Sequence, residues 1–407
     1  MPDSPSLLAS RSFVLLAAAR LVSALGSAVA PVALAFALVE AGRPAADVGV
    51  VLGARAAAVV VALPLAGVVA HRYPVRAVLV GAALLAAAAQ AAAAALVLAG
   101  HAEPWPLALS QAVGGIAAAL HVPAAGSALP GTVPSELLPH ANAVVRLGAN
   151  AALIGGSAAG GVMVAAAGPG WSIAADAASF LLAAALCTGM RPSPRHGRRA
   201  SGAASPGLAR ELAEGWQDVR SRTWLWACVL QCAVVNAAVA AGIEVLGPVA
   251  AHRLLGGAAA WGAVLAAQSA GLLVGGLVAV RLRTARPLRD GVAALLLVAP
   301  LPALLAAAAP LPVLVVAALP AGAGLEVFAV HWNTVMQRHV PADRLSRVYA
   351  YDGLGSNAAV PLGAALAGPV ESVVGLSGAL LGSAFAIVVP TAAVLASRAV
   401  RGLPASP

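Results

Sequence analysis

Residues 147–161 read LGANAALIGGSAAGG, and the first six letters return almost unchanged as LGSNAA at residues 354–359. The two copies are 207 positions apart in a chain of 407 residues. Matches continue at the same offset, because Pro134 corresponds to Pro341 and Gly156 to Gly363. The repeat therefore raises the possibility that one half of the chain is a copy of the other.

A second pair of segments has nearly the same spacing. GVVAHR begins at Gly67 and GLVAVR begins at Gly276, an offset of 209 residues. Chance similarity among segments rich in alanine and glycine is the alternative explanation. Two pairs at nearly equal offsets favour a duplicated half that keeps its orientation.

The composition is that of a membrane protein. The chain is 61% hydrophobic and 10% charged, so it cannot surround a soluble core with a charged surface. A hydrocarbon layer requires about 20 apolar residues per helix. The apolar stretches are too long for barrel strands and do not alternate, which predicts helices. Twelve spans are predicted, at residues 12–38, 48–70, 77–99, 106–130, 144–167, 171–190, 224–250, 261–280, 291–309, 312–332, 347–369 and 373–397.

Two features of the apolar sequence have other interpretations. The first stretch resembles a secretory signal, but it is longer than a signal core and eleven further spans follow it. Cys228 and Cys232 are one helical turn apart, which is compatible with a metal site. No other ligand type accompanies them, so packing is the favoured interpretation.

Arginine predicts the orientation of the spans. All 24 basic residues are arginines, and 19 of them fall in segments that are cytoplasmic if the amino terminus is cytoplasmic. Only Arg43 and Arg253 fall in outer loops. The positive-inside rule therefore predicts that both termini are cytoplasmic, in a cell membrane. Because the basic charge is dispersed over several loops, a nucleic-acid partner is not expected.

The absence of lysine excludes some chemistry. A Walker A loop and a Schiff base both require a lysine, so neither ATP binding of that kind nor covalent lysine catalysis is available. No zinc-protease motif or recognisable set of catalytic residues occurs, and a membrane-embedded enzyme is not expected. No cofactor is implied, and His121 and His331 stand alone, so no metal is expected.

Residues 191–222 are predicted to be a cytoplasmic linker between residues 1–190 and residues 223–407, each of which would form a bundle of six helices. The linker begins with a Pro/Gly/Ser/Arg-rich part. From Leu208 onward, apolar residues at helical spacing predict a short amphipathic helix on the inner membrane face.

The chain resembles the major facilitator superfamily. The resemblance rests on RLVSALGSAVAPVALAFAL in the first span, GVVAHRYPVR after the second, VLGPVAAHRLLGGAAAWG across the seventh and eighth, and VPADRLSRVYAYDGLGSNAAVPLGAALAGP into the eleventh. It is most similar to the drug/proton antiporter branch that includes macrolide-type and siderophore exporters. The resemblance implies two parallel six-helix repeats, a small-molecule substrate moved by alternating access, and proton coupling.

The chain departs from the motifs of that family in three places. In the inner loop after the second span, Gly67, Arg72 and Arg76 fit the expected pattern, whereas His71 replaces the acidic residue. Ser110 stands where antiporters often have an arginine four residues before a glycine, here Gly114. The fifth span has small residues at 156–161 but lacks the proline of the antiporter motif.

Small residues form a stripe on two of the spans. Gly148, Gly156 and Gly160 are at multiples of four, and Gly355 and Gly363 repeat the pattern 207 residues later. Such stripes allow helix backbones to approach each other closely. Ordinary packing within one bundle is one interpretation. The family resemblance implies another, in which these spans form a movable contact between the two halves.

Ionisable residues within spans are the best candidates for a substrate cavity or a proton path, because each is costly in hydrocarbon. We expect Glu326 to be near the membrane midplane, with Asn333 on its face of the helix, and to carry the coupled proton; Glu244 is the second choice. A permanent Glu/Arg pair with a purely structural role is the alternative. Asp176 either bonds Ser179 in its own helix or faces a cavity. The remaining candidates are Arg20 and Arg55.

The sequence therefore predicts a monomeric transporter in the lipid bilayer. We expect it to export an amphipathic small organic molecule in a proton-driven manner, as a drug-resistance efflux pump does. The walls expected between the halves contain mostly Ala, Val, Leu and Gly, which favours such a molecule over a sugar. An importer, a lipid flippase or a non-transporting sensor of the same fold are the alternatives.

Overall fold

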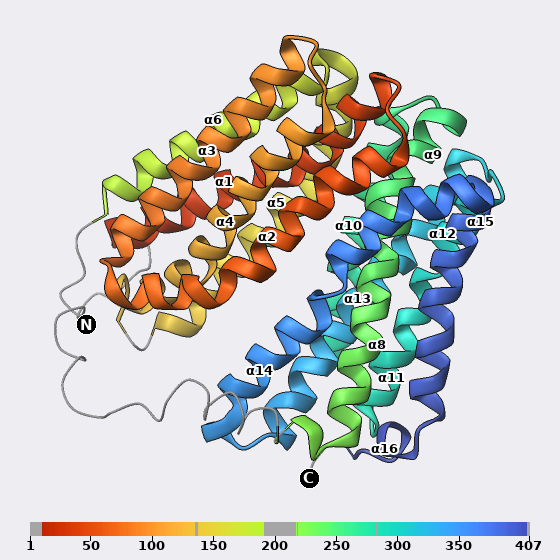
Figure 1. The fold of residues 1–407 in the computed structure, drawn as a ribbon. Coiled ribbons are helices and arrows are strands. Elements are labelled where there is room, and N and C mark those ends of the chain that lie inside the picture. Colours follow the sequence, from red (N-terminus) through yellow and green to blue (C-terminus); the bar gives the residue numbers. More distant parts are fainter. Residues whose placement is uncertain (1–9, 135–136, 191–216, 218, 282–283, 405–407) are drawn as a thin grey trace. The chain divides into compact units, whose positions relative to one another are not determined.

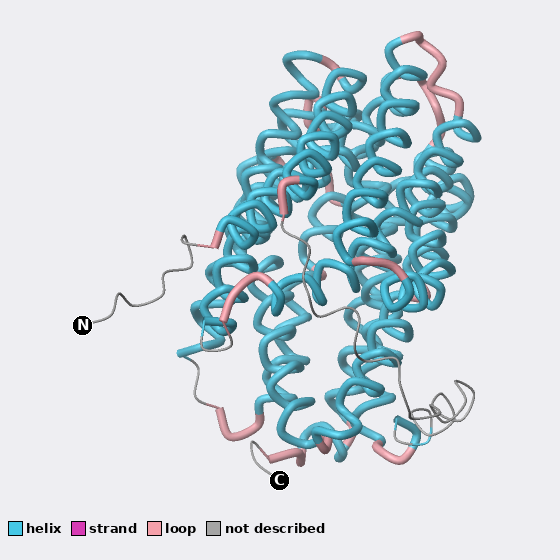
Figure 2. The backbone as a smooth tube through the Cα atoms, turned by 90° about the vertical axis from the view of Figure 1, so that its left-hand side faces the viewer, coloured by secondary structure: helices cyan, strands magenta, loops and turns pink. Residues whose placement is uncertain are grey.

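The computed structural model describes residues 10–134, 137–190, 217, 219–281 and 284–404. Helices make up almost all of this part of the chain, and no strand occurs in it (Figure 2). The predicted amphipathic helix in the linker is almost entirely outside the described residues. The chain divides into two compact units, residues 1–43 with 50–201 and residues 44–49 with 202–407.

The first unit consists of six long helices joined by short turns (Figure 1). They are α1 (Arg11–Glu40), α2 (Ala45–Arg72), α3 (Val75–Leu98), α4 (Pro104–Ala128), α5 (Leu138–Ala167) and α6 (Pro169–Thr188). The side chain of Ser10 accepts a hydrogen bond from the backbone N–H of Phe13 and caps α1. Proline is at the start of α4, α5 and α6, where its missing N–H costs no helical hydrogen bond.

The second unit contains more breaks. Its elements are α8 (Thr223–Val239), the π-helical η5 (Ala240–Val245), α9 (Leu246–Leu254), α10 (Ala258–Arg281), α11 (Pro287–Ala294), the 3₁₀ turn η6 (Leu295–Val298), α12 (Pro300–Ala306), α13 (Leu311–His339), α14 (Ala342–Asn357), α15 (Val360–Ala396) and α16 (Arg398–Arg401). The predicted seventh span thus comprises α8, η5 and α9, and the ninth comprises α11, η6 and α12.

Ten helices in the described chain are long and apolar enough to cross a membrane. One of them, Tyr351–Ala396, is 46 residues long and contains non-helical backbone at Gly375, so it supplies two crossings. The 30 residues of α5 supply one more. The protein is therefore an all-α integral membrane protein with twelve transmembrane helices, as predicted.

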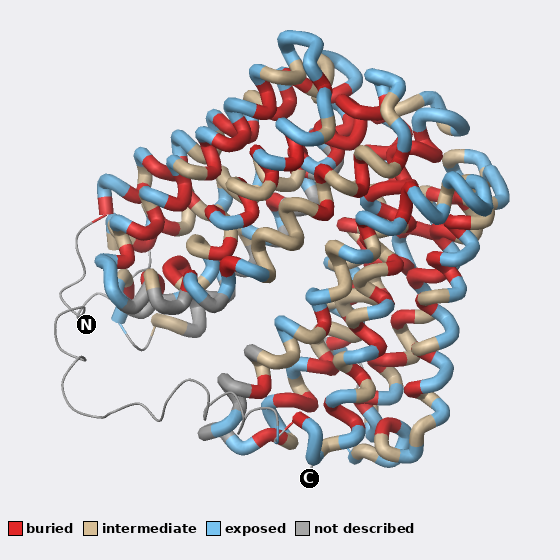
Figure 3. The backbone as a smooth tube through the Cα atoms, in the orientation of Figure 1, coloured by how far each residue is buried: buried red, intermediate tan, exposed pale blue. Residues whose placement is uncertain are grey.

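Each unit has apolar packing between its helices and apolar surface outside them. Buried and exposed residues alternate along the helices (Figure 3). Phe13, Leu16 and Leu79 belong to a buried cluster in the first unit, and Trp224 and Trp332 to one in the second. Large apolar side chains remain exposed outside these clusters, as expected for helices that face lipid.

The same backbone turn follows corresponding helices of the two units. Gly168, between α5 and α6, has φ 84° and ψ 165°, and Gly375 has φ 75° and ψ 167°. These glycines are 207 positions apart, the offset of the sequence repeat. Since glycine adopts positive φ without a steric penalty, both sites break the chain at equivalent places. The same turn thus recurs in the backbone at the offset of the sequence match, as the predicted duplication implies.

The ends of α3 and α12 form a second matching pair. The N–H of His101 bonds the carbonyl of Leu96, and the N–H of Ala309 bonds that of Leu304, as in a Schellman motif. The left-handed position is Gly100 after α3, with φ 76°, but Ala308 after α12, with φ 52°. Ala308 is the one non-glycine residue with positive φ in the described chain.

Replacement of Ala308 by glycine is expected to stabilise the fold by about 0.5–1 kcal/mol. The removal of the crowded β-carbon gains about 1–2 kcal/mol, and the greater freedom of glycine in the unfolded chain offsets part of it. The thermal unfolding midpoint of the purified protein measures the effect. Ala307→Gly is the control, because Ala307 has φ −80° and should gain nothing. A lower midpoint for Ala308→Gly would contradict the assignment.

Candidate functional site

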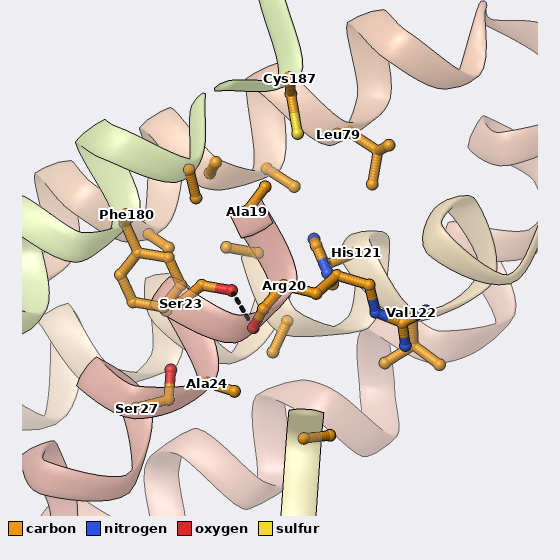
Figure 4. A pocket seen from close by; sticks show the side chains of 18 of the residues that line it. Ala19, Arg20, Ser23, Ala24, Ser27, Leu79, His121, Val122, Phe180 and Cys187 are labelled. Atoms are coloured by element: carbon orange, nitrogen blue, oxygen red, sulfur yellow. Dashed lines mark hydrogen bonds between the residues drawn. The ribbon is translucent and has the colours of Figure 1, made fainter. Parts of the chain in front are cut away.

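The first unit contains a cavity of about 250 Å³ between α1, α2, α3, α4, α5 and α6. Its walls are mainly alanine, with Leu16 and Leu79 on one side. Polar and aromatic groups interrupt this apolar lining at a few places, namely Arg20, Ser23, Ser27, Arg55, His121 and Phe180. Figure 4 shows Arg20 beside His121, with Ser23, Ser27 and Phe180 nearby. The predicted site residues Arg20 and Arg55 therefore share one cavity.

Close packing of α2 on α4 positions Arg55. A β-carbon at Gly115 would lie 2.4 Å from the carbonyl oxygen of Arg55, so the two backbones are in contact there. A β-carbon at Gly114 would lie 3.2 Å from a guanidinium nitrogen of Arg55. The absence of a side chain at Gly114 in α4 thus leaves room for the guanidinium group of Arg55, which belongs to α2. Ser110, at the position where antiporters often have that arginine, is buried and donates to the carbonyl of Leu107.

Asp176 is the acid of a buried hydrogen-bond network in the first unit. Its carboxylate accepts a bond of 2.5 Å from the amide of Gln90, which in turn accepts one of 2.9 Å from Gln111. Ser179 donates to both the carbonyl oxygen and the carboxylate of Asp176, at 2.7 and 3.3 Å. The expected bond within the helix therefore exists, together with links to α3 and α4. Gln90 and Gln111 were not among the predicted site residues, although two glutamines in alanine-rich spans were a usable signal.

Absence of a side chain at Gly26 allows α1 to pack on this network. A β-carbon there would lie 2.2 Å from the hydroxyl oxygen of Ser179 and 2.5 Å from a carboxylate oxygen of Asp176. Gln90 and Gln111 are buried with Asp176, and Ser179 is half-buried beside Gly26. The network therefore fixes the orientation of Asp176.

Glu326, in α13, lies against α10. A β-carbon at Gly276 would be 3.6 Å from Cγ of Glu326, whose side chain is half-buried. Glu326 has no hydrogen-bond or ion-pair partner within the described part of the chain. Asn333 is exposed and donates to the carbonyl of Ala329, while it accepts a bond of 3.0 Å from Tyr349. The amide expected to accompany Glu326 is thus bonded to other groups.

Glu244 lies in the π-helical turn η5 and is exposed. Pro248, four residues later, has no N–H to bond the carbonyl of Glu244, and its ring would clash with that carbonyl in a regular α-helix. The wider turn relieves this clash. Such π-helical turns occur frequently at functional sites, which keeps Glu244 a candidate.

The hydrogen bonds of Asp352 indicate a structural role. Its carboxylate accepts a bond of 3.0 Å from the indole of Trp332 and one of 3.1 Å from Ser356. The indole belongs to α13 and the carboxylate to α14, so the bond joins the two helices. Trp332 also stacks on Phe328 and meets Trp224 edge-on. Asp352 is therefore engaged in packing at this end of the second unit.

The glycine stripes contact helices of their own units. A β-carbon at Gly156 would lie 2.7 Å from the carbonyl oxygen of Leu25 in α1, and Gly160 is packed on Val29 of the same helix. A β-carbon at Gly363 would lie 2.1 Å from the carbonyl oxygen of Ala237 in α8. These contacts correspond to ordinary packing within one bundle, which is one of the two interpretations of the stripes given above. A movable contact between the units remains a prediction.

The segment around the end of α2, which is predicted to be an inner loop, is described only in part. Arg72 is exposed and Arg76 is half-buried. The side chains at Gly67 and His71 lie outside the described set. The gate role of these four residues therefore stays a prediction.

The family model of the Major Facilitator Superfamily matches residues 16–364, which include both units and most of the twelve spans. The chain belongs to this superfamily. Its helical architecture, its internal repeat and the resemblance stated above agree with that membership. No curated protein matches the chain.

Solved structures of superfamily-like transporters share the fold. The D323A mutant of the nucleoside transporter NupG is 14% identical with a TM-score of 0.73, and the alignment covers 94% of this chain and 99% of that one. A bacterial homolog of the human lysosomal transporter Spinster is 16% identical with a TM-score of 0.71, and 95% and 96% are covered. A D-xylose-proton symporter is 13% identical with a TM-score of 0.66, and 95% and 99% are covered. At these identities the similarity concerns the fold.

Proposed function

We propose that this superfamily member is a secondary active transporter that exports an amphipathic small organic molecule in exchange for protons. The cavity of the first unit supports the proposal best, because it combines alanine walls with a few polar groups from several helices. The absence of lysine supports a gradient as the energy source, since a Walker A loop is impossible. The two six-helix units would alternate between inward-open and outward-open states as a monomer.

Glu326 is our candidate for the proton carrier and Glu244 is the second. Glu326 is a half-buried acid in a predicted span, and no described side chain pairs with it. In general, apolar surroundings favour the protonated form of a carboxyl group and a nearby cation favours the ionised form. An acid that meets both environments in turn can couple proton movement to the alternation of the units.

A drug panel in a host that lacks its own pumps tests this function. Expression of the chain should lower the accumulation of at least one amphipathic compound, and a proton uncoupler should remove the difference. Higher accumulation on expression would indicate an importer, and movement of labelled phospholipid in vesicles would indicate a flippase. A sensor would move no solute in either assay. Each of these three results would contradict export.

The orientation gives a further prediction. Cysteines introduced at Arg43 and Arg253 should react with an impermeant maleimide added to intact cells, and cysteines in residues 191–222 should react only after permeabilisation. The arginine asymmetry favours this outcome. Both outer arginines are also ion-paired, Arg43 with Glu103 and Arg253 with Glu371, which reduces the positive charge of the outer side. The reverse labelling pattern would overturn cytoplasmic termini.

A further inference from the structure

Two guanidinium groups line the cavity of the first unit without a protein partner. Arg20 comes from α1 and Arg55 from α2, and both side chains are half-buried. Among the described residues, neither guanidinium donates a hydrogen bond or forms an ion pair. A charge within a membrane-spanning bundle is costly unless it is paired or faces a polar ligand. The two arginines therefore have unused capacity to bind an anion.

The nearby acid is not available as that anion. Asp176 is close enough for its charge to act on Arg55, but it forms no ion pair with it. Gln90 and Ser179 hold the carboxylate, and Gln111 holds Gln90 in turn. To reach Arg55, the carboxylate would have to break these buried bonds. The network thus keeps the Asp176 carboxylate out of contact with the guanidinium groups. Its negative charge nevertheless offsets part of the positive charge of Arg55.

The local charge balance favours a singly charged ligand. Arg20 and Arg55 supply two positive charges, Asp176 supplies one negative charge behind the wall, and no aspartate or glutamate lines the cavity among the described residues. A monoanion would complete the balance, whereas a cation would meet repulsion. Ser23, Ser27 and His121 provide further polar groups beside the two arginines.

The remaining walls fit an apolar body. Apart from the polar groups, the cavity is lined by alanines, Gly114, Cys187, Leu16, Leu79, Val122 and the ring of Phe180. Its volume of about 250 Å³ is near the lower end of the range for small-molecule pockets, about 300–1,000 Å³. One aromatic ring system or a short aliphatic chain therefore matches the space better than a large macrocycle does.

We propose that the cavity binds the carboxylate of an amphipathic organic acid between Arg20 and Arg55, with the apolar body of the molecule against the alanine walls. The guanidinium groups would hold the carboxylate by charge-assisted hydrogen bonds, which are stronger than hydrogen bonds between neutral groups. The inference rests on the proposed function, in that it names the chemical class of the transported molecule.

Binding of three matched probes tests the proposal on the full chain in lipid nanodiscs without a gradient. The probes are 2-naphthoate, 2-naphthylmethanol and 2-naphthylmethylammonium, and titration calorimetry measures their dissociation constants. The acid should bind about tenfold or more tightly than the alcohol, and the amine should bind most weakly. Benzoate and benzyl alcohol repeat the comparison with a smaller ring.

Variants then locate the binding. Arg20→Gln and Arg55→Gln should each weaken naphthoate binding about tenfold and leave the alcohol unchanged, while Arg20→Lys and Arg55→Lys should retain part of the preference. Arg286→Gln is the control, because it removes one positive charge from an exposed position in the other unit. The thermal unfolding midpoint identifies any variant that has lost its fold. If a glutamine variant has lost it, the binding preference of the corresponding lysine variant tests the proposal instead.

Three outcomes would overturn the proposal. The first is equal binding of each acid and its alcohol. The second is unchanged naphthoate binding in the Arg20 and Arg55 variants. The third is a loss of naphthoate binding in Arg286→Gln as large as in those variants, which would indicate attraction to the overall charge of +9. Failure of the proposed function is separable. A chain that binds naphthoate selectively but moves no solute contradicts transport alone, and a chain that exports only neutral compounds and does not prefer naphthoate contradicts this inference alone.

Discussion

Glu326→Gln is expected to abolish efflux driven by a pH gradient and to preserve downhill exchange of substrate across the membrane. Glutamine retains the size of the side chain but cannot take up or release a proton. The half-buried position of Glu326 against Gly276 means that the substitution introduces little steric change. Driven flux should fall to the level of protein-free vesicles, whereas exchange should stay near that of the unmodified protein.

Reconstituted vesicles separate the two fluxes. In the first assay an inside-acid gradient drives uptake of substrate into the vesicles, because protons leave as substrate enters, and this uptake is the counterpart of efflux from a cell. In the second assay, labelled substrate exchanges against unlabelled substrate without a gradient. Glu371→Gln is the matched control, because it removes a carboxylate that is ion-paired with Arg253. Unchanged driven flux in Glu326→Gln would remove this residue from the mechanism, and loss in Glu244→Gln alone would assign the proton to the π-helical turn. A loss of both fluxes in Glu326→Gln would indicate a structural role.

Gly363→Ala should impair the protein far more than Gly148→Ala, although both residues belong to the same repeated stripe. A β-carbon at Gly363 would lie 2.1 Å from the backbone oxygen of Ala237, a contact that only helix displacement can relieve. At Gly148 the nearest atom would be a side-chain carbon of Leu21 at 3.8 Å, an ordinary contact. Overpacking of this kind costs about 1–3 kcal/mol or more.

Thermal unfolding and exchange flux, measured on the same preparations, test this contrast. Gly363→Ala should lower the unfolding midpoint and the flux together, because the contact with α8 lies inside one unit. Gly156→Ala should behave similarly through its contact with α1. A normal unfolding midpoint with lost flux in both variants would instead support a movable contact between the units. Equal effects at Gly148 and Gly363 would contradict the packing described above.

The membrane helices were predictable because composition and length determine them. The third span, expected at residues 77–99, is α3 (Val75–Leu98), and the sixth, expected at 171–190, is α6 (Pro169–Thr188). Breaks within a span were harder to predict. The π-helical turn before Pro248 was not predicted, because a proline alone does not distinguish a kink from a wider turn. Hydropathy is also uninformative about Gly375, since apolar residues flank it on both sides.

The site was predictable in its charged members and not in its neutral ones. Arg20 and Arg55 stand out from apolar sequence by their cost in a membrane, and the structure places them around one cavity. Gln90 and Gln111 carry no charge, so their importance depends on their partner, Asp176. Long-range hydrogen bonds between helices cannot be read from spacing along one helix. The bond from Tyr349 in α14 to Asn333 in α13 was missed for the same reason.

The described residues with positive φ lie at or near breaks between helices, namely Gly42, Gly100, Gly168, Gly256, Gly257, Ala308 and Gly375. Gly100 and Ala308 share a hydrogen-bonding pattern but not a residue type. If both turns descend from one ancestral half, the conformation has outlived the glycine that suits it best. Backbone geometry at these turns is then an older trait than the amino acids that now form it.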